Sequence, residues 1–163
     1  MVANSRNVVM EGMTIVFPNF RGLEGRYNQA GQRNFCVKLD DKVAEQMAKD
    51  GWTVKWLKAR EEGDEEQAIL HINVNFKGRP PRVVIITSRG RTTLTEDEIE
   101  ILDWADIQTV DLIVGPYDWN INGKTGTKAY LQSMYVTINE DALELKYADV
   151  MDINSRSGRT IDD

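Results

Sequence analysis

The stretch from Gln67 to Lys77 constrains the fold more than any other part of this chain. Its sequence, QAILHINVNFK, alternates between apolar residues from Ala68 to Phe76 and a second set that is mostly polar. Successive side chains of a β-strand point to opposite faces, so the pattern predicts a strand with one face in a core and the other face polar. His71 falls on the polar face, where we expect a surface residue rather than a catalyst.

Weaker patterns of the same kind predict further strands before and after this one. Gly12 is expected to bend the first of them, and Asn122-Gly123 is expected to form the two-residue turn of a hairpin between the last two. The expected strands cover 8–17, 33–39, 52–58, 83–86, 104–119 and 127–138.

Two short helices are expected between these strands. One covers 42–50 after the capping pair Asp40-Asp41, and the other begins at a Thr95–Glu98 capping box and ends near Asp103. About six or seven short strands with two helices favour a mainly β (β-rich α+β) fold, either a small barrel or a sandwich.

Length and composition predict one domain of ordinary type. The chain has 163 residues and a mass of 18.6 kDa, which is enough to bury a core without disulfides. Its apolar runs are shorter than the ~20 residues of a membrane span, and its first residues do not resemble a signal peptide. We therefore expect a cytoplasmic protein without membrane contact.

One cysteine and one histidine limit the site chemistry. Cys36 cannot form an internal disulfide, and together with His71 it cannot supply a thiolate and imidazole zinc site. Cys36 lies in the middle of an expected strand, so we expect a buried and inert thiol. The expectation is a protein without metal or cofactor.

The charges of the chain are segregated along the sequence. Acidic residues outnumber basic ones by 26 to 20, and the resulting charge of −6 argues against nucleic-acid binding by the whole surface. Salt confines surface fields to about 10 Å, so a local basic groove remains compatible with this charge. The cations gather at 21–38, 55–60, 77–91 and 124–128, and the acids at 61–66, 96–106 and 139–163.

The basic segment from Phe17 to Lys38 interleaves aromatic rings, cations and glycines. Rings stack on bases and guanidinium groups pair with phosphates, so the segment predicts binding of single-stranded nucleic acid. Phe17 and Phe35 lie in the strands that frame the segment and are expected to pack inward. The expected ligand-facing part is therefore Phe20 through Arg33. The alternative is a long hairpin loop whose aromatics pack down and whose arginines keep it soluble.

Motifs for catalysis are weak. Gly123-Lys124-Thr125 resembles the end of a phosphate-binding loop, but Asp118 stands where that loop needs a glycine, and a strand follows in place of a helix. The sequence suggests neither converging carboxylates nor a Ser/His/Asp set, so we expect a protein that is not an enzyme. The rival to nucleic-acid binding is a structural or protein-interaction domain, such as a virion accessory or regulatory protein. A nuclease or nucleotide-handling enzyme fits less well.

The arrangement of these motifs resembles the OB-fold single-stranded DNA-binding proteins of double-stranded-DNA bacteriophages. The resemblance extends to about Val150 and is carried by Phe20-Arg21-Gly22, Gly25-Arg26-Tyr27, Arg33-Asn34-Phe35-Cys36-Val37, Gly51-Trp52, Trp56-Leu57-Lys58, Phe76-Lys77-Gly78-Arg79-Pro80-Pro81, Gly123-Lys124 and Lys128-Ala129-Tyr130-Leu131. It implies an OB-fold-like small antiparallel barrel. It also implies sequence-independent binding and protection of single-stranded DNA during phage DNA replication and recombination in the host-cell cytoplasm.

In proteins of this family an acidic C-terminal tail often contacts replication enzymes. Here we expect an OB-like nucleic-acid-binding domain over 1–148 and a disordered, mostly acidic tail over 149–163, which the resemblance makes a candidate contact for replication or recombination enzymes. Arg156 and Arg159 interrupt its acids, and the terminal Asp162-Asp163 follows no aromatic residue, so the tail departs from the family pattern. A homodimer is compatible with the sequence.

The residues expected to contact DNA are the cations and aromatics of the four basic clusters. The cations are Arg21, Arg26, Arg33, Lys58, Lys77, Arg79, Arg82, Arg89, Arg91, Lys124 and Lys128. The aromatic stacking candidates are Phe20, Tyr27, Trp56, Tyr117, Trp119 and Tyr130.

Overall fold

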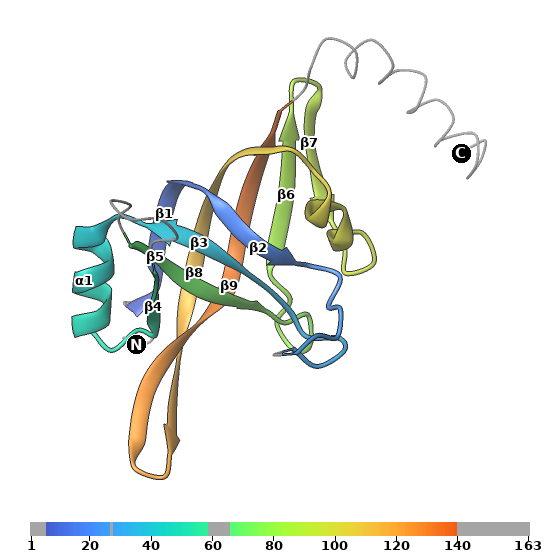
Figure 1. Cartoon of the computed structure of the whole chain (residues 1–163). Helices are drawn as coiled ribbons and strands as arrows, with labels where there is room; N and C mark the ends of the chain where they lie inside the picture. The colour runs from blue at the N-terminus through green and yellow to red at the C-terminus, as the bar shows by residue number, and fades with distance from the viewer. Residues whose placement is uncertain (1–5, 27, 59–65, 140–163) are drawn as a thin grey trace.

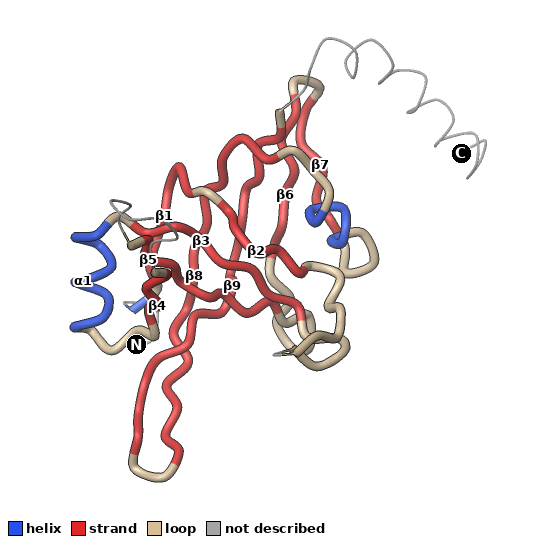
Figure 2. The backbone as a smooth tube through the Cα atoms, viewed as in Figure 1, coloured by secondary structure: helices blue, strands red, loops and turns tan. Residues whose placement is uncertain are grey.

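A computed structural model of the chain describes residues 6–26, 28–58 and 66–139, and β-strands make up most of them (Figures 1 and 2). The strands are β1 (Val8–Met13), β2 (Ile15–Asn19), β3 (Arg33–Leu39), β4 (Val54–Leu57), β5 (Gln67–Val74), β6 (Arg82–Thr87), β7 (Gly90–Leu94), β8 (Ile107–Ile121) and β9 (Lys124–Ile138). One α-helix, α1 (Asp41–Lys49), and one 3-10 helix, η2 (Ile99–Asp103), complete the elements named in this part of the chain. The mainly β fold class is confirmed.

The sheet closes on itself through its first strand. Its pairing order is β1-β8-β9-β5-β3-β2, and β1 and β2 are separated along the chain by Thr14 alone. The backbone bends at Gly12, which has a φ of +65°, and the pairing register shifts between Met10 and Met13. β1 and β2 therefore act as one bent strand that pairs with β8 at its start and β3 at its end. The strands on this path form a partly open, OB-like barrel.

The expected barrel differs from the observed one in the direction of two pairings. β9 pairs in parallel with β5 at Ile72↔Ala129 and with β6 over Arg82–Ile86, whereas the expectation was an antiparallel barrel. Neither parallel pair is joined by a tight hairpin: β6, β7 and β8 lie between β5 and β9 along the chain, and β7 and β8 lie between β6 and β9.

The two expected helices are present, but they are of different types. α1 begins after Asp40 and ends where the Trp52 N–H donates to the Met47 carbonyl at 3.0 Å. The second is a short 3-10 helix, preceded by the expected contact in which the Thr95 N–H donates to Glu98 Oε1 at 2.9 Å. Within the described part of the chain, neither helix has the length and apolarity needed to cross a bilayer.

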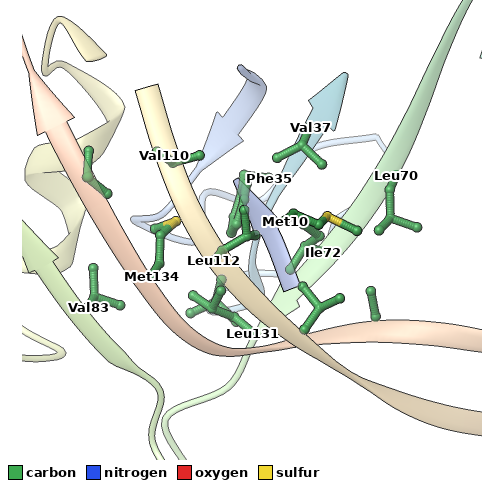
Figure 3. Close-up of a cluster of buried hydrophobic side chains, with 14 of the residues drawn as sticks. Met10, Phe35, Val37, Leu70, Ile72, Val83, Val110, Leu112, Leu131 and Met134 are labelled. Atoms are coloured by element: carbon green, nitrogen blue, oxygen red, sulfur yellow. The ribbon is translucent and has the colours of Figure 1, made fainter. Parts of the chain in front are cut away.

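The core lies inside the barrel and contains the apolar face of β5 that the sequence pattern predicts. Leu70 and Ile72 are buried there together with Phe35 and Val37 of β3 (Figure 3). Side chains from β1, β6, β8 and β9 complete the same cluster; those labelled in Figure 3 are Met10, Val83, Val110, Leu112, Leu131 and Met134.

Two phenylalanines exchange the places expected for them. Phe20, expected to face the ligand, is fully buried, and its ring stacks on Phe35 with the ring centroids 5.0 Å apart. Phe17, expected to pack inward, is 58% exposed and has a φ of +52°. This left-handed backbone and the shift of register between Val16 and Asn19 break the alternation of β2, so the sequence period assigns Phe17 to the wrong face. Phe20 was expected in an exposed loop, but it lies just after β2 and packs into the core against Phe35.

Because Phe20 is a core residue, Phe20→Ala should lower the free energy of unfolding by about 3–5 kcal/mol through loss of apolar burial and creation of a cavity. The exposed Phe17 is a matched control, and Phe17→Ala should change the same quantity by about 0.5 kcal/mol or less. Urea denaturation of both variants followed by fluorescence tests this pair. Equal effects would contradict the placement of the two rings.

Candidate nucleic-acid interface

Two adjoining hollows lie along the polar face of β5. The first has a volume of about 280 Å³ and is lined by Thr53, Lys55, His71, Asn73, Trp119 and Lys128. The second has a volume of about 230 Å³ and is lined by Gly31, Gln32, Arg33, Asn73, Val74, Asn75, Lys77 and Tyr130. Asn73 belongs to both, so the hollows form one continuous depression, called here the β5 groove.

The strand register explains why these side chains meet. On one edge of β5, β4 pairs with its first half and places Lys55 opposite Ile69. β9 then takes over the same edge and places Tyr130 beside Asn73. Neighbouring residues in register share a face of the sheet, so the outward side chains of β4, β5 and β9 converge on one surface.

The long β8–β9 hairpin forms one wall of the groove and extends beyond the rest of the sheet at the bottom of Figure 1. Tyr117 of β8 lies opposite Lys128 of β9. The rings of Tyr117 and Tyr130 are 5.7 Å apart and tilted by 56°. The expected turn at Asn122-Gly123 is confirmed, with φ values of +53° and +83°. The hairpin thus carries neighbouring aromatic rings beside a lysine.

Trp119 lies flat against its own hairpin because its cross-strand partner has no side chain. It pairs with Gly126, where an added Cβ would be 2.6 Å from the indole ring. The indole Nε1 is buried and has no hydrogen-bond partner among the described residues. Glycine at position 126 therefore gives the ring the space in which it lines the first hollow.

The loop between β2 and β3 closes the other end of the groove, and a single carboxylate holds its start. Asp103, at the end of η2, accepts the N–H of Phe20 at 2.7 Å and the N–H of Arg21 at 3.0 Å. The buried Phe20 ring adds a second anchor. Further along the loop, the Gly31 N–H donates to the Gly22 carbonyl at 2.8 Å. These contacts position Gly31 and Gln32 at the second hollow.

The groove is a positively charged place on an acidic chain. Among the described residues that line the two hollows, none is Asp or Glu. The pKa of His71 is lowered by burial and, in addition, by the positive charges of Lys55 and Lys128. Cys36 is buried, as expected, on the strand next to His71. Burial raises the pKa of its thiol, and the charge of Lys55 partly opposes this effect. Burial is the main cause of both shifts, and the smaller effects of Lys55 on both groups and of Lys128 on His71 reflect the positive charge at the first hollow.

The structure brings only some of the expected contact residues to this groove. Those that line it or stand beside it are Arg33, Lys77, Tyr117, Trp119, Lys128 and Tyr130. Lys124 is exposed near the tip of the hairpin, and Arg79 and Arg82 are exposed in the turn after Lys77 and at the start of β6. Arg26 and Lys58 are exposed on neighbouring loops, whereas Tyr27 lies outside the described residues.

Other expected contacts lie elsewhere or have protein partners. Trp56 is 39% exposed, but it pairs with the buried Ala68 and so belongs to the face of β4 opposite to the groove. Arg89 and Arg91 lie on the β6–β7 hairpin, at the top of Figure 1 and far from the tip of the β8–β9 hairpin. The buried Phe20 cannot stack on a base.

Two of the expected arginines are engaged with acids and rings. Arg21 lies 4.9 Å from the Trp104 ring centroid, and its Nε is 3.7 Å from Asp103. Arg33 lies over Phe76, and its Nη1 is 2.9 Å from Glu96 at the edge of the second hollow. A phosphate that binds either guanidinium has to share it with these partners. The groove lysines form no ion pair with the described residues, and they are therefore the stronger candidates.

Sequence reasoning missed Thr53, Lys55, His71 and Asn73 as groove residues. The polar face of the 67–77 stretch was visible in its alternation, and this was the available signal for His71 and Asn73. Thr53 and Lys55 line the groove because of the register between β4 and β5, and the sequence does not reveal this register.

The barrel and its groove define the class of protein: an OB-like fold in which a strand face and the flanking loops form the binding surface. The chain belongs to the family described as "Putative phage ssDNA-binding domain", whose model matches residues 1–160. The resemblance inferred from the motifs is therefore confirmed. No sequence among the curated proteins matches this chain.

Solved structures of similar fold come from the same kind of source. A C-terminally truncated single-stranded DNA-binding protein from bacteriophage Enc34 matches with a TM-score of 0.51 at 11% identity, over 84% of this chain and 88% of that one. The same phage protein in complex with ssDNA matches with a TM-score of 0.51 at 10% identity, over 84% and 89% of the two chains. At these identities the likeness concerns the fold.

Gly126→Ala should displace the Trp119 ring, because the new methyl group would overlap it. We expect a changed near-UV circular dichroism signal and a shifted tryptophan emission, with a cooperative unfolding transition retained. Gly25→Ala is the matched control, since an added Cβ at Gly25 meets nothing within 4 Å. An unchanged indole signal in Gly126→Ala would contradict the packing of Trp119.

Proposed function

We propose that this chain binds single-stranded DNA without sequence preference and protects it during phage DNA replication and recombination, in the cytoplasm of the host cell. Bases stack on the aromatic rings of the β8–β9 hairpin, and phosphates bind the lysines of the β5 groove. The proposal is for a binding protein and includes no catalytic step. Membership of a phage ssDNA-binding family supports it.

The observation that carries this proposal is the composition of the groove. A chain with a net charge of −6 lines the groove with Lys55, Lys77 and Lys128, and with no acid among the described lining residues. Tyr117, beside the groove, is 58% exposed although it is a large ring. Exposed rings beside cations are the features by which single-stranded binders hold unpaired bases and the backbone.

The absence of sequence preference follows from the same features. Every base has a flat face that can stack on a ring, and the backbone phosphate is common to all nucleotides. A duplex hides its base faces, so the exposed tyrosines favour an unpaired strand. The OB fold typically covers about 4–16 nucleotides, and we expect a footprint in this range.

The deciding experiment is a titration of the full chain with oligo-dT at two salt concentrations, followed by tryptophan fluorescence. The affinity should fall with salt with a slope of about −0.7 for each phosphate neutralised. Lys128→Ala should reduce that slope by about the same amount, and Lys42→Ala, on α1 and outside the groove, should leave it unchanged. No binding at low salt, or tighter binding of duplex, would exclude the proposal.

Tyr130→Ala and Tyr117→Ala should each weaken oligo-dT binding by about 1–3 kcal/mol, because each removes a stacking surface. Trp56→Ala should bind as the wild type does, because Trp56 lies on the face of β4 opposite to the groove. Filter binding or fluorescence anisotropy at constant salt measures these affinities. A loss in Trp56→Ala equal to that of the tyrosine variants would place the strand on another face.

Two parts of the proposal concern partners. The tail, 149–163, lies outside the described residues. We propose that it contacts replication or recombination enzymes and that the protein forms a homodimer.

The competing function is a protein-interaction domain whose exposed rings contact another protein. That function predicts a stable complex with a protein and no dependence of DNA association on salt.

A further inference from the structure

His71 occupies a junction in the sheet. The edge of β5 that faces away from β3 is covered by β4 up to Leu70 and by β9 from Ile72 onward. His71 stands between the two pairings, with its side chain on the groove face. The segment that leads into β4 also contacts β9 at this point: the Thr53 N–H donates to the Thr127 carbonyl at 2.9 Å. The first hollow lies over this junction.

The hollow is built of cationic and neutral groups that come from different strands. Lys55 enters from β4 and Lys128 from β9, whose parallel register with β5 puts position 128 beside position 71. Its volume of about 280 Å³ leaves room for a phosphate group with some of its water, since a water in the liquid occupies about 30 Å³.

The other titratable and charged groups around His71 are few in the described structure. Cys36 of β3 lies directly opposite His71, and Lys38 lies opposite Ile69, one position along the same face. The Asp118 carboxylate precedes Trp119 on β8, but it accepts two hydrogen bonds from Arg6, at 2.7 and 3.1 Å, and one from Thr127. Among the described residues, no carboxylate lines the hollow.

We propose that this hollow is a subsite for one backbone phosphate of the bound strand, and that His71 takes up a proton when the strand binds and becomes the third cationic ligand of that phosphate. The inference rests on the proposed function. It specifies where one phosphate binds and couples that binding to protonation of His71. The phosphodiester is recognised by the two lysine ammonium groups and the imidazolium together.

The direction of the pH dependence of DNA binding follows from the charges around His71. In the free protein, burial, Lys55 and Lys128 all hold the pKa of His71 below its ordinary value, so the imidazole is neutral near pH 7. A phosphate between the lysines offsets their charge and favours the imidazolium, so the pKa rises in the complex. DNA affinity therefore rises as pH falls through the pKa of the complex, and levels off below the pKa of the free protein.

His71 is the single histidine of the chain, so the proton on its imidazole Cε1 gives one assignable NMR signal in the full-length protein. Titrating this signal with pH, without DNA and with saturating oligo-dT at constant ionic strength, should show a pKa higher by about one unit in the complex. The affinity of the wild type should increase about threefold to tenfold from pH 8 to pH 6. His71→Gln should lose this increase, so that its affinities at pH 6 and pH 8 are equal.

Lys55→Gln provides a second measurement that does not need DNA. Removal of its charge should raise the pKa of His71 in the free protein. An unchanged or lower histidine pKa in the DNA complex, or a His71→Gln variant with the pH dependence of the wild type, would overturn the inference while DNA binding stands. If oligo-dT does not bind at any pH, the proposed function fails and the subsite fails with it.

Discussion

The pairing of β9 on both of its edges is the constraint on which the rest of the structure depends. One edge pairs with β8 from Ile107 to Ile121, and the other pairs in turn with Thr53, with β5 and with β6. Thr53, β5 and β6 all lie far from β9 in the sequence, whereas β8 directly precedes it. β9 therefore brings together parts of the chain that no local pattern would pair. The inward side chains of β9, including Leu131 and Met134, fill the core, while its outward side chains complete the groove.

The groove has a floor within the sheet and two ends that are built differently. Its floor is β5, whose backbone is hydrogen-bonded on both edges, and whose inner face is packed in the core. Its ends are the β2–β3 loop, held by the Asp103 carboxylate and the Phe20 ring, and the β8–β9 hairpin, which extends away from the barrel. A floor of this kind keeps the cations in place, and the projecting hairpin adds exposed surface such as the Tyr117 ring. Both properties suit a ligand with a regular backbone and variable bases.

The local charge of the groove is compatible with the acidic character of the whole chain because the two act over different distances. Screening limits surface fields to about 10 Å, so acids farther than this from the groove have little influence inside it. Several acids also have partners: Asp103 pairs with Arg21, Glu96 with Arg33, and Asp118 with Arg6. The hydrogen bonds from Arg6 and Thr127 lower the pKa of Asp118, which is therefore ionised at neutral pH.

Local patterns in the sequence determined most of the strands, though not β7, and also the apolar face of β5, the Asn122-Gly123 turn and the family resemblance. They could do so because side-chain alternation and turn chemistry depend on neighbouring residues. The same patterns misplaced Phe17, where an irregular β2 breaks the period, and the loop expected around Phe20 instead buries that ring in the core. Only the tertiary structure decided that Lys55, His71 and Lys128 share one hollow and that Trp56 does not belong to it. The physical reason is that strand register and the order of strands in a sheet are set by contacts between distant segments, which no local pattern encodes.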